Sequence, residues 1–163
     1  MLINLKSKDT LIIDEFKFKC CIGKNGTVSK KREGDYKTPA GKYKIGKLYY
    51  RADRVQKPQT NLKVKIIKKT MGWCNDPTHK LYNQEVTIKK KIKCEKLFRK
   101  DHKYDYFIII EYNTKITLPD RGSAIFLHLT KNYKPTAGCV ALSKKDFLIL
   151  IKIINKKTII NIN

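Results

Sequence analysis

The sequence predicts a mainly β fold in a single domain that covers residues 1–163, with one or two short helices. Several short segments alternate apolar and charged residues, which is the period of a half-buried strand. Two other segments are continuous apolar runs, which suit central strands buried on both faces. One apolar stripe of helical period lies near the C-terminus. With 41% hydrophobic residues, the chain can bury a core of its own.

The alternating segments come first in the chain. Residues 16–20 alternate aromatic and lysine side chains before a cysteine, and residues 23–26 (Gly-Lys-Asn-Gly) then predict a turn. Residues 43–45 and 62–66 repeat the alternation. Each of these segments is predicted to be a strand with one face toward the core.

The second half of the chain carries the continuous apolar runs. Residues 106–110 and 124–127 contain no charged side chain and are predicted to be central strands. Between the alternating and continuous segments, residues 94–100 are expected to form a short helix. Residues 158–162 are expected to return to the sheet as a last strand.

The best-marked helix follows Ser143. This serine can cap the first turn, and Asp146 three residues later completes a variant of the capping box. Apolar residues then recur at i, i+3, i+4 and i+7, at Phe147, Leu150, Ile151 and Ile154. The spacing predicts one buried stripe.

The chain is strongly basic, with 37 Lys and Arg against 14 Asp and Glu and a net charge of +23. Such a field favours anionic partners, including wall polymers and membrane surfaces. The lysines are spread along the chain and do not gather in one motif-bearing helix, which argues against nucleic-acid binding. A compositional origin is the second interpretation, because abundant Lys, Ile and Asn are also what an AT-biased genome encodes.

The cysteines and the apolar runs exclude several classes of protein. Five cysteines at irregular spacing argue against a disulfide framework, and the lack of a Cys-x-x-Cys pair argues against structural zinc. We therefore expect no metal and no cofactor. No signal peptide is legible, and the longest apolar run, residues 147–151, is too short to span a membrane. The sequence does not indicate an oligomeric state.

Two neighbouring segments carry the residues of a nucleophilic site. His128 ends an apolar run, and Cys139 follows eleven residues later, directly after Gly138. A thiol is a strong nucleophile only as thiolate, and an imidazole can take its proton and return it to a leaving group. Glycine lets the backbone turn so that amide N–H groups point at an incoming carbonyl. We predict Cys139 as nucleophile, His128 as base and acid, and Gly138 at the oxyanion site.

Several assignments around this pair stay open. His102 is a rival base, because it has acidic neighbours on both sides. A catalytic histidine also needs an acceptor for its second nitrogen. A backbone carbonyl can serve, and Asp105, Asp120 and Ser123 are the side-chain candidates.

The flanking residues resemble the L,D-transpeptidase (YkuD-type) catalytic domain. The main segments that carry the resemblance are residues 38–41, 122–128 and 135–142, and the secondary ones are residues 32–35, 50–54, 72–77 and 101–105. The family motif is a His, a variable spacer, then Ser or Thr, His, Gly and Cys, often with Arg two residues later. Thr136, Gly138 and Cys139 match this motif, whereas Ala137 and Ala141 replace its second His and its Arg. The resemblance starts at about residue 20 and indicates a branch with shortened His-to-Cys spacing.

The resemblance implies a β-sandwich or flattened barrel that crosslinks peptidoglycan stem peptides through a cysteine thioester. Thr136 is then a substrate-binding candidate by its place in the motif. Trp73, the single tryptophan, either walls a substrate groove or packs in the core. Arg121 either pairs with a substrate carboxylate or is an ordinary surface residue.

Two other functions and two locations remain open at this stage. Water in place of an amine acceptor would make the protein an L,D-carboxypeptidase, and the changes at Ala137 and Ala141 are consistent with that. A basic wall- or nucleic-acid-binding module without turnover is the other alternative. The resemblance implies the cell envelope or periplasm, and the cytoplasm is the alternative because no signal peptide is legible.

Overall fold

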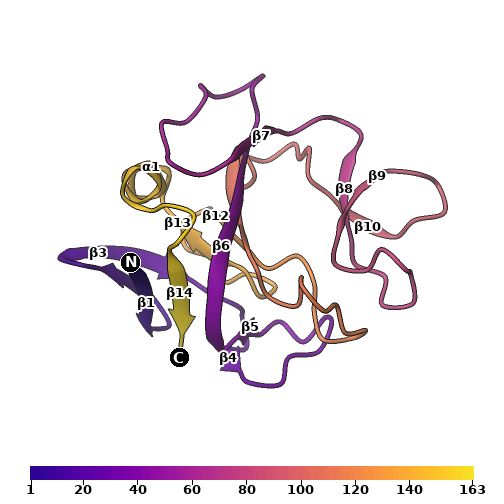
Figure 1. Cartoon of the computed structure of the whole chain (residues 1–163), viewed down its shortest axis with the longest axis horizontal. Helices are drawn as coiled ribbons and strands as arrows, with labels where there is room; N and C mark the ends of the chain where they lie inside the picture. Colours follow the sequence, from indigo (N-terminus) through magenta and orange to yellow (C-terminus); the bar gives the residue numbers. More distant parts are fainter.

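Eight strands close into a barrel-like sheet in the computed structural model, which describes residues 1–163 (Figure 1). The order around the barrel is β11 (Tyr106–Ile110), β12 (Phe126–Leu129), β13 (Val140–Leu142), β3 (Phe16–Cys21), β2 (Thr10–Ile13), β1 (Leu2–Ser7), β14 (Ile159–Ile162) and β6 (Gly41–Tyr50). Pairing of β6 with β11 closes the ring, and β7 (Val64–Ile66) adds to the other edge of β6. The mainly β prediction is confirmed.

Two smaller sheets flank the barrel. One contains β8 (Met71–Cys74), β9 (Glu85–Thr87) and β10 (Cys94–Lys96), with β8 in the middle. Figure 1 shows it beside the barrel, at the right of the view. The other pairs β4 (Thr27–Val28) with β5 (Thr38–Pro39) at the lower end.

The helix α1 (Lys144–Ile153) follows β13 directly and covers one side of the barrel (Figure 1). Ser143 caps it as predicted, because its Oγ accepts a hydrogen bond of 3.1 Å from the Asp146 N–H. Its apolar stripe is buried, which confirms the predicted spacing. No helix of this protein has the length and apolarity that crossing a bilayer requires.

The barrel wall separates two hydrophobic clusters. The larger one fills the barrel interior and the space under α1. The smaller one, here called the outer cluster, lies between the barrel and the β8–β10 sheet and consists of Tyr49, Ile67, Met71, Trp73, Leu97, Tyr104, Phe107, Ala124, Phe126 and Cys139. Strands β11 and β12 contribute to both clusters, which explains why they are continuously apolar.

The structure corrects two of the expected elements. Residues 94–100 do not form a helix, because Cys94–Lys96 pairs as strand β10 with β8. The apolar run near residue 124 begins its strand later, at Phe126, because Ala124 has a positive φ of 53° that takes it out of the extended region. Strands β1 and β2 were not predicted.

Candidate active site

Strands β12 and β13 place Cys139 and His128 on the same face of the sheet. The two strands are parallel, with His128 opposite Ala141 and Leu127 opposite Val140. Cys139 directly precedes β13, two residues before Ala141, and lines the same cavity as His128. Leu127 and Val140 point to the barrel interior instead.

Both side chains line one cavity of about 360 Å³. Thr136, Gly138 and both alanines of the altered motif also line it. Charged and polar residues from distant segments complete the wall: Lys31, Glu33, Asn75, Glu95, Arg99, Lys103, Tyr104, Ser123, Lys131 and Lys134. The cavity can therefore admit a polar substrate to the thiol.

His128 is buried at 5% exposure and held in one orientation. Its Nδ1 lies 2.8 Å from the Leu129 carbonyl oxygen, and its ring packs edge-on against Tyr104. A carbonyl can only accept, so Nδ1 carries the proton and Nε2 is the basic nitrogen. Burial lowers the pKa of His128 to about 4, and the positive charges of Lys103 and Arg99 act in the same direction.

Cys139 is also nearly buried, at 8% exposure. Its thiol donates to the Ala124 carbonyl at 3.2 Å and accepts a weak bond from the Phe126 N–H at 3.4 Å. Burial raises the pKa of this thiol to about 12, and Glu95 adds to the effect, while Lys31 opposes it. The thiol makes no hydrogen bond to His128 in this structure.

The turn before Cys139 is fixed by Thr136. The Thr136 hydroxyl donates to the Cys139 carbonyl at 2.6 Å and accepts the Gly138 N–H at 3.1 Å. Gly138 has a φ of 144°, and a Cβ there would lie 2.8 Å from the Lys37 carbonyl oxygen. Only glycine fits this position.

Comparison with protein families decides the class of this protein. The model of the L,D-transpeptidase catalytic domain (YkuD) matches residues 2–162, nearly the whole chain. The chain belongs to this family. The match also includes β1 and β2, which the motif-based resemblance did not reach. Comparisons with curated proteins and with solved structures gave no match.

Membership of this family bears on the activity of the protein and on its location in the cell. It supports an L,D-transpeptidase-family activity on peptidoglycan. The family is typically found in the cell envelope. The barrel with its single helix agrees with the fold of this family.

Two of the predicted site residues of this L,D-transpeptidase-family protein lie away from the cavity. Trp73 packs edge-on against Phe126 in the outer cluster, and Arg121 is exposed. His102 is exposed as well, with Nε2 3.0 Å from the Thr130 carbonyl oxygen. None of these three residues lines the cavity.

The acceptor for His128 is a backbone carbonyl, one of the options that the sequence left open. Two of the three side-chain candidates have other partners. Asp105 pairs with Arg54 at 3.1 Å, and Ser123 donates to Glu33 at 2.8 Å. The third, Asp120, does not line the cavity.

Two carboxylates in the cavity were missed by sequence reasoning. Glu33 accepts hydrogen bonds from Ser123 and from the Tyr82 hydroxyl. Glu95 accepts from the Tyr104 hydroxyl at 2.5 Å, and burial raises its pKa. Glu33 lies within a segment that resembles the family, whereas no local pattern marks Glu95.

Asn83 is a third residue that the sequence did not indicate, and it supports the thiol through Ala124. It is 3% exposed, and its Oδ1 accepts from the Trp73 indole at 2.9 Å and from the Ala124 N–H at 3.0 Å. Its Nδ2 donates to the carbonyls of Tyr112 and Asn113. Asn83 therefore fixes Ala124, whose own carbonyl holds the Cys139 thiol.

We expect Asn83→Ala to lower the free energy of unfolding by about 3 kcal/mol, because it leaves several buried groups without partners. Urea unfolding measures this loss. Asn132→Ala is the matched control, since Asn132 is exposed and has a similar positive φ of 54° against 56° for Asn83. Equal losses in the two variants would mean that backbone conformation, and not the hydrogen bonds, sets the effect.

Proposed function

We propose that this protein is a cysteine acyltransferase that acts on peptidoglycan stem peptides, with Cys139 as nucleophile and His128 as base and acid. The observation that carries the proposal is the common cavity, into which β12 and β13 bring both side chains from the same face of the sheet. Family membership supports the substrate class.

In the first half-reaction the thiol sulfur attacks the amide carbonyl that follows an L-centre in the stem tetrapeptide. The thiol proton passes to His128 Nε2 and then to the nitrogen of the departing D-amino acid as the C–N bond breaks. A thioester on Cys139 remains. In the second half-reaction an amine acceptor attacks the thioester, its proton returns through His128, and the thiol is restored.

The resting site holds a neutral thiol and a neutral imidazole. Their pKa values, about 12 for Cys139 and about 4 for His128, lie on either side of neutral pH. The proton therefore moves when the substrate is bound, and not before. The Cys139 thiol has to exchange its bond to the Ala124 carbonyl for one to His128 at that stage.

The turn offers two free backbone donors to the cavity. The Gly138 N–H is bonded to Thr136, whereas the N–H groups of Ala137 and Cys139 have no acceptor. We assign the oxyanion contact to the Cys139 N–H, with Gly138 and Thr136 holding the turn. Asn75 Oδ1 is a buried acceptor without a partner at the cavity wall and is available to a substrate N–H.

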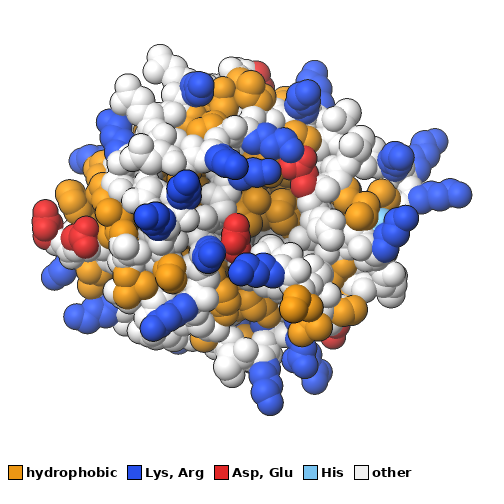
Figure 2. Space-filling model, in the orientation of Figure 1, with side chains coloured by type: hydrophobic (Ala, Val, Ile, Leu, Met, Phe, Trp, Pro, Cys, Tyr) orange, Lys and Arg blue, Asp and Glu red, His pale blue; other side chains and the backbone are white.

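Hydrogen-bond acceptors in the cavity support an amine acceptor, and surface charge supports an anionic polymer. Glu33 and Glu95 line the cavity and can accept hydrogen bonds from the amine that attacks the thioester. Basic side chains are spread over the face seen in Figure 2 and suit the anionic cell wall, which is where we propose that the protein acts.

Intact-mass measurement after incubation with a stem tetrapeptide tests the proposal. We expect the mass of the protein to increase, through an adduct on Cys139, by the mass of the tetrapeptide minus that of the released D-amino acid, which carries away the thiol proton. Added diamino-acid peptide should convert the adduct to a crosslinked product. Release as free tripeptide alone would indicate an L,D-carboxypeptidase, and no adduct would exclude both enzymes and leave the binding module.

A further inference from the structure

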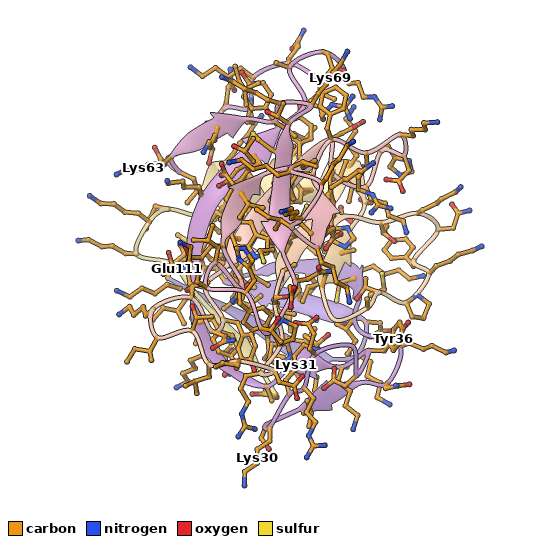
Figure 3. The ribbon with its side chains drawn as sticks, turned by 90° about the vertical axis from the view of Figure 1, so that its right-hand side faces the viewer. Lys30, Lys31, Tyr36, Lys63, Lys69 and Glu111 are labelled. Carbon is orange, nitrogen blue, oxygen red and sulfur yellow. The ribbon has the colours of Figure 1, made fainter.

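Lys31 is an unusual lysine in this basic protein. It is 3% exposed, and only Arg51 among the other basic side chains is buried to the same degree. Its sequence neighbour Lys30 is exposed. Figure 3 labels both: Lys30 extends outward at the lower edge, whereas Lys31 lies within the outline of the molecule. Burying an ammonium is costly, so the position of Lys31 calls for a physical reason.

Two glycines of the active-site segments make room for Lys31. A Cβ on Gly122 would lie 2.7 Å from Lys31 Cε, and Gly122 has a φ of 91°. A Cβ on Gly138 would lie 3.3 Å from Lys31 Nζ. The ammonium therefore lies beside the turn that presents Cys139, and Lys31 lines the same cavity.

The ammonium retains donor capacity in this position. It bonds Asp35 Oδ1 at 2.5 Å and makes a long contact of 3.4 Å to the Arg32 carbonyl. The Asp35 carboxylate also accepts the N–H groups of Arg32 and Lys37, which spread its negative charge over three donors. A lysine ammonium has three N–H bonds, so it can still meet an anion in the cavity.

We infer that Lys31 is a catalytic residue, whose ammonium stabilises the Cys139 thiolate and the oxyanion formed during acyl transfer. The inference rests on the proposed function. It follows from the geometry of the turn, because the Thr136 hydroxyl occupies the Gly138 N–H and so removes a backbone donor beside the thiol, at the position where Lys31 Nζ lies close to Gly138. A fixed positive charge in a site shielded from water supplies what the missing donor would have supplied.

A purely structural role is the rival explanation, since the Lys31–Asp35 ion pair also ties the 31–37 loop together. Asp35→Asn separates the two roles. It breaks the ion pair but keeps the ammonium, whereas Lys31→Met removes the ammonium and keeps the length of the side chain. Lys31→Arg keeps the charge, and Lys30→Met is the control on an exposed neighbour.

The test is alkylation of Cys139 by neutral iodoacetamide and by anionic iodoacetate, followed by peptide mass mapping. We expect Lys31→Met to raise the pKa of the thiol by about one unit and to lower the iodoacetate-to-iodoacetamide rate ratio about tenfold. Lys31→Arg, Lys30→Met and Asp35→Asn should keep the wild-type ratio or exceed it. Near-UV circular dichroism checks that each variant is folded.

Equal losses in Lys31→Met and Asp35→Asn, or an unchanged rate ratio in Lys31→Met, would overturn the inference. If Lys31→Met does not fold, the wild-type ratio at Cys139 is compared with that at Cys94, the partly exposed cysteine. A ratio no higher at Cys139 than at Cys94 would also overturn it. These reagents need no peptide substrate. If Lys31→Met lowers the rate ratio as expected but the wild type is not acylated by the tetrapeptide, only the proposed function is overturned.

Discussion

We expect replacement of Cys139 by alanine or serine to abolish acylation by a stem tetrapeptide, with a loss of at least about 10³-fold, while the fold persists. The physical reason is that the Cys139 sulfur is the only thiol that lines the cavity with His128. The variants change one atom group in a turn that Thr136 and Gly138 already fix. Intact mass after incubation measures the adduct.

The other cysteines provide matched controls for this result. Cys20, Cys74 and Cys94 are free thiols outside the cavity, and each Cys→Ser variant should keep the acylation rate if it folds. Activity that survives in Cys139→Ala would end the assignment of the nucleophile. Equal loss in folded variants of the three control cysteines would show that the assay reports stability and not chemistry.

We expect replacement of His128 by alanine to slow acylation by about 10²–10⁴-fold, the usual effect of losing a general base. His102→Ala should have little effect, because His102 is exposed and outside the cavity. Single-turnover acylation by a neutral acyl donor measures both variants. A larger loss in His102→Ala would transfer the role of base to that residue.

The pH profile of the wild type gives an independent check on His128. Burial lowers the pKa of His128 to about 4, so the imidazole remains neutral and able to accept a proton down to about pH 5. We therefore expect the acylation rate to stay flat between pH 7 and pH 5 and to fall only as the pH approaches 4. An ordinary histidine with a pKa of about 6.5 would lose most of its base form at pH 5. A fall centred near pH 6.5 would contradict the buried geometry.

The sequence predicted those parts of the fold that depend on neighbours along the chain. The stripe of α1 and its Ser143 cap are local patterns, and the structure has both. The continuous run at residues 106–110 became β11 without change. The prediction of a helix over residues 94–100 was wrong. The three-residue strand found there is stabilised by its pairing with β8, and no local pattern shows that pairing.

The sequence also determined, by itself, the family and the pair of residues to which we assign catalysis. The features that mark this pair are local: Gly138 directly precedes Cys139, and His128 ends an apolar run. They can be recognised from neighbouring residues without knowledge of how the rest of the chain folds. The family match over residues 2–162 agrees with the family that those segments indicated.

Only the tertiary structure decided what surrounds that pair. Lys31, Asn83 and Glu95 come from three loops or strands far from Cys139 in the chain. The pairing of β10 with β8 and the packing of the loops bring them to the site. The same packing buries Cys139 and His128 and sets both as neutral groups. Burial and contact between distant residues depend on the closed sheet as a whole, and for that physical reason a local pattern cannot encode them.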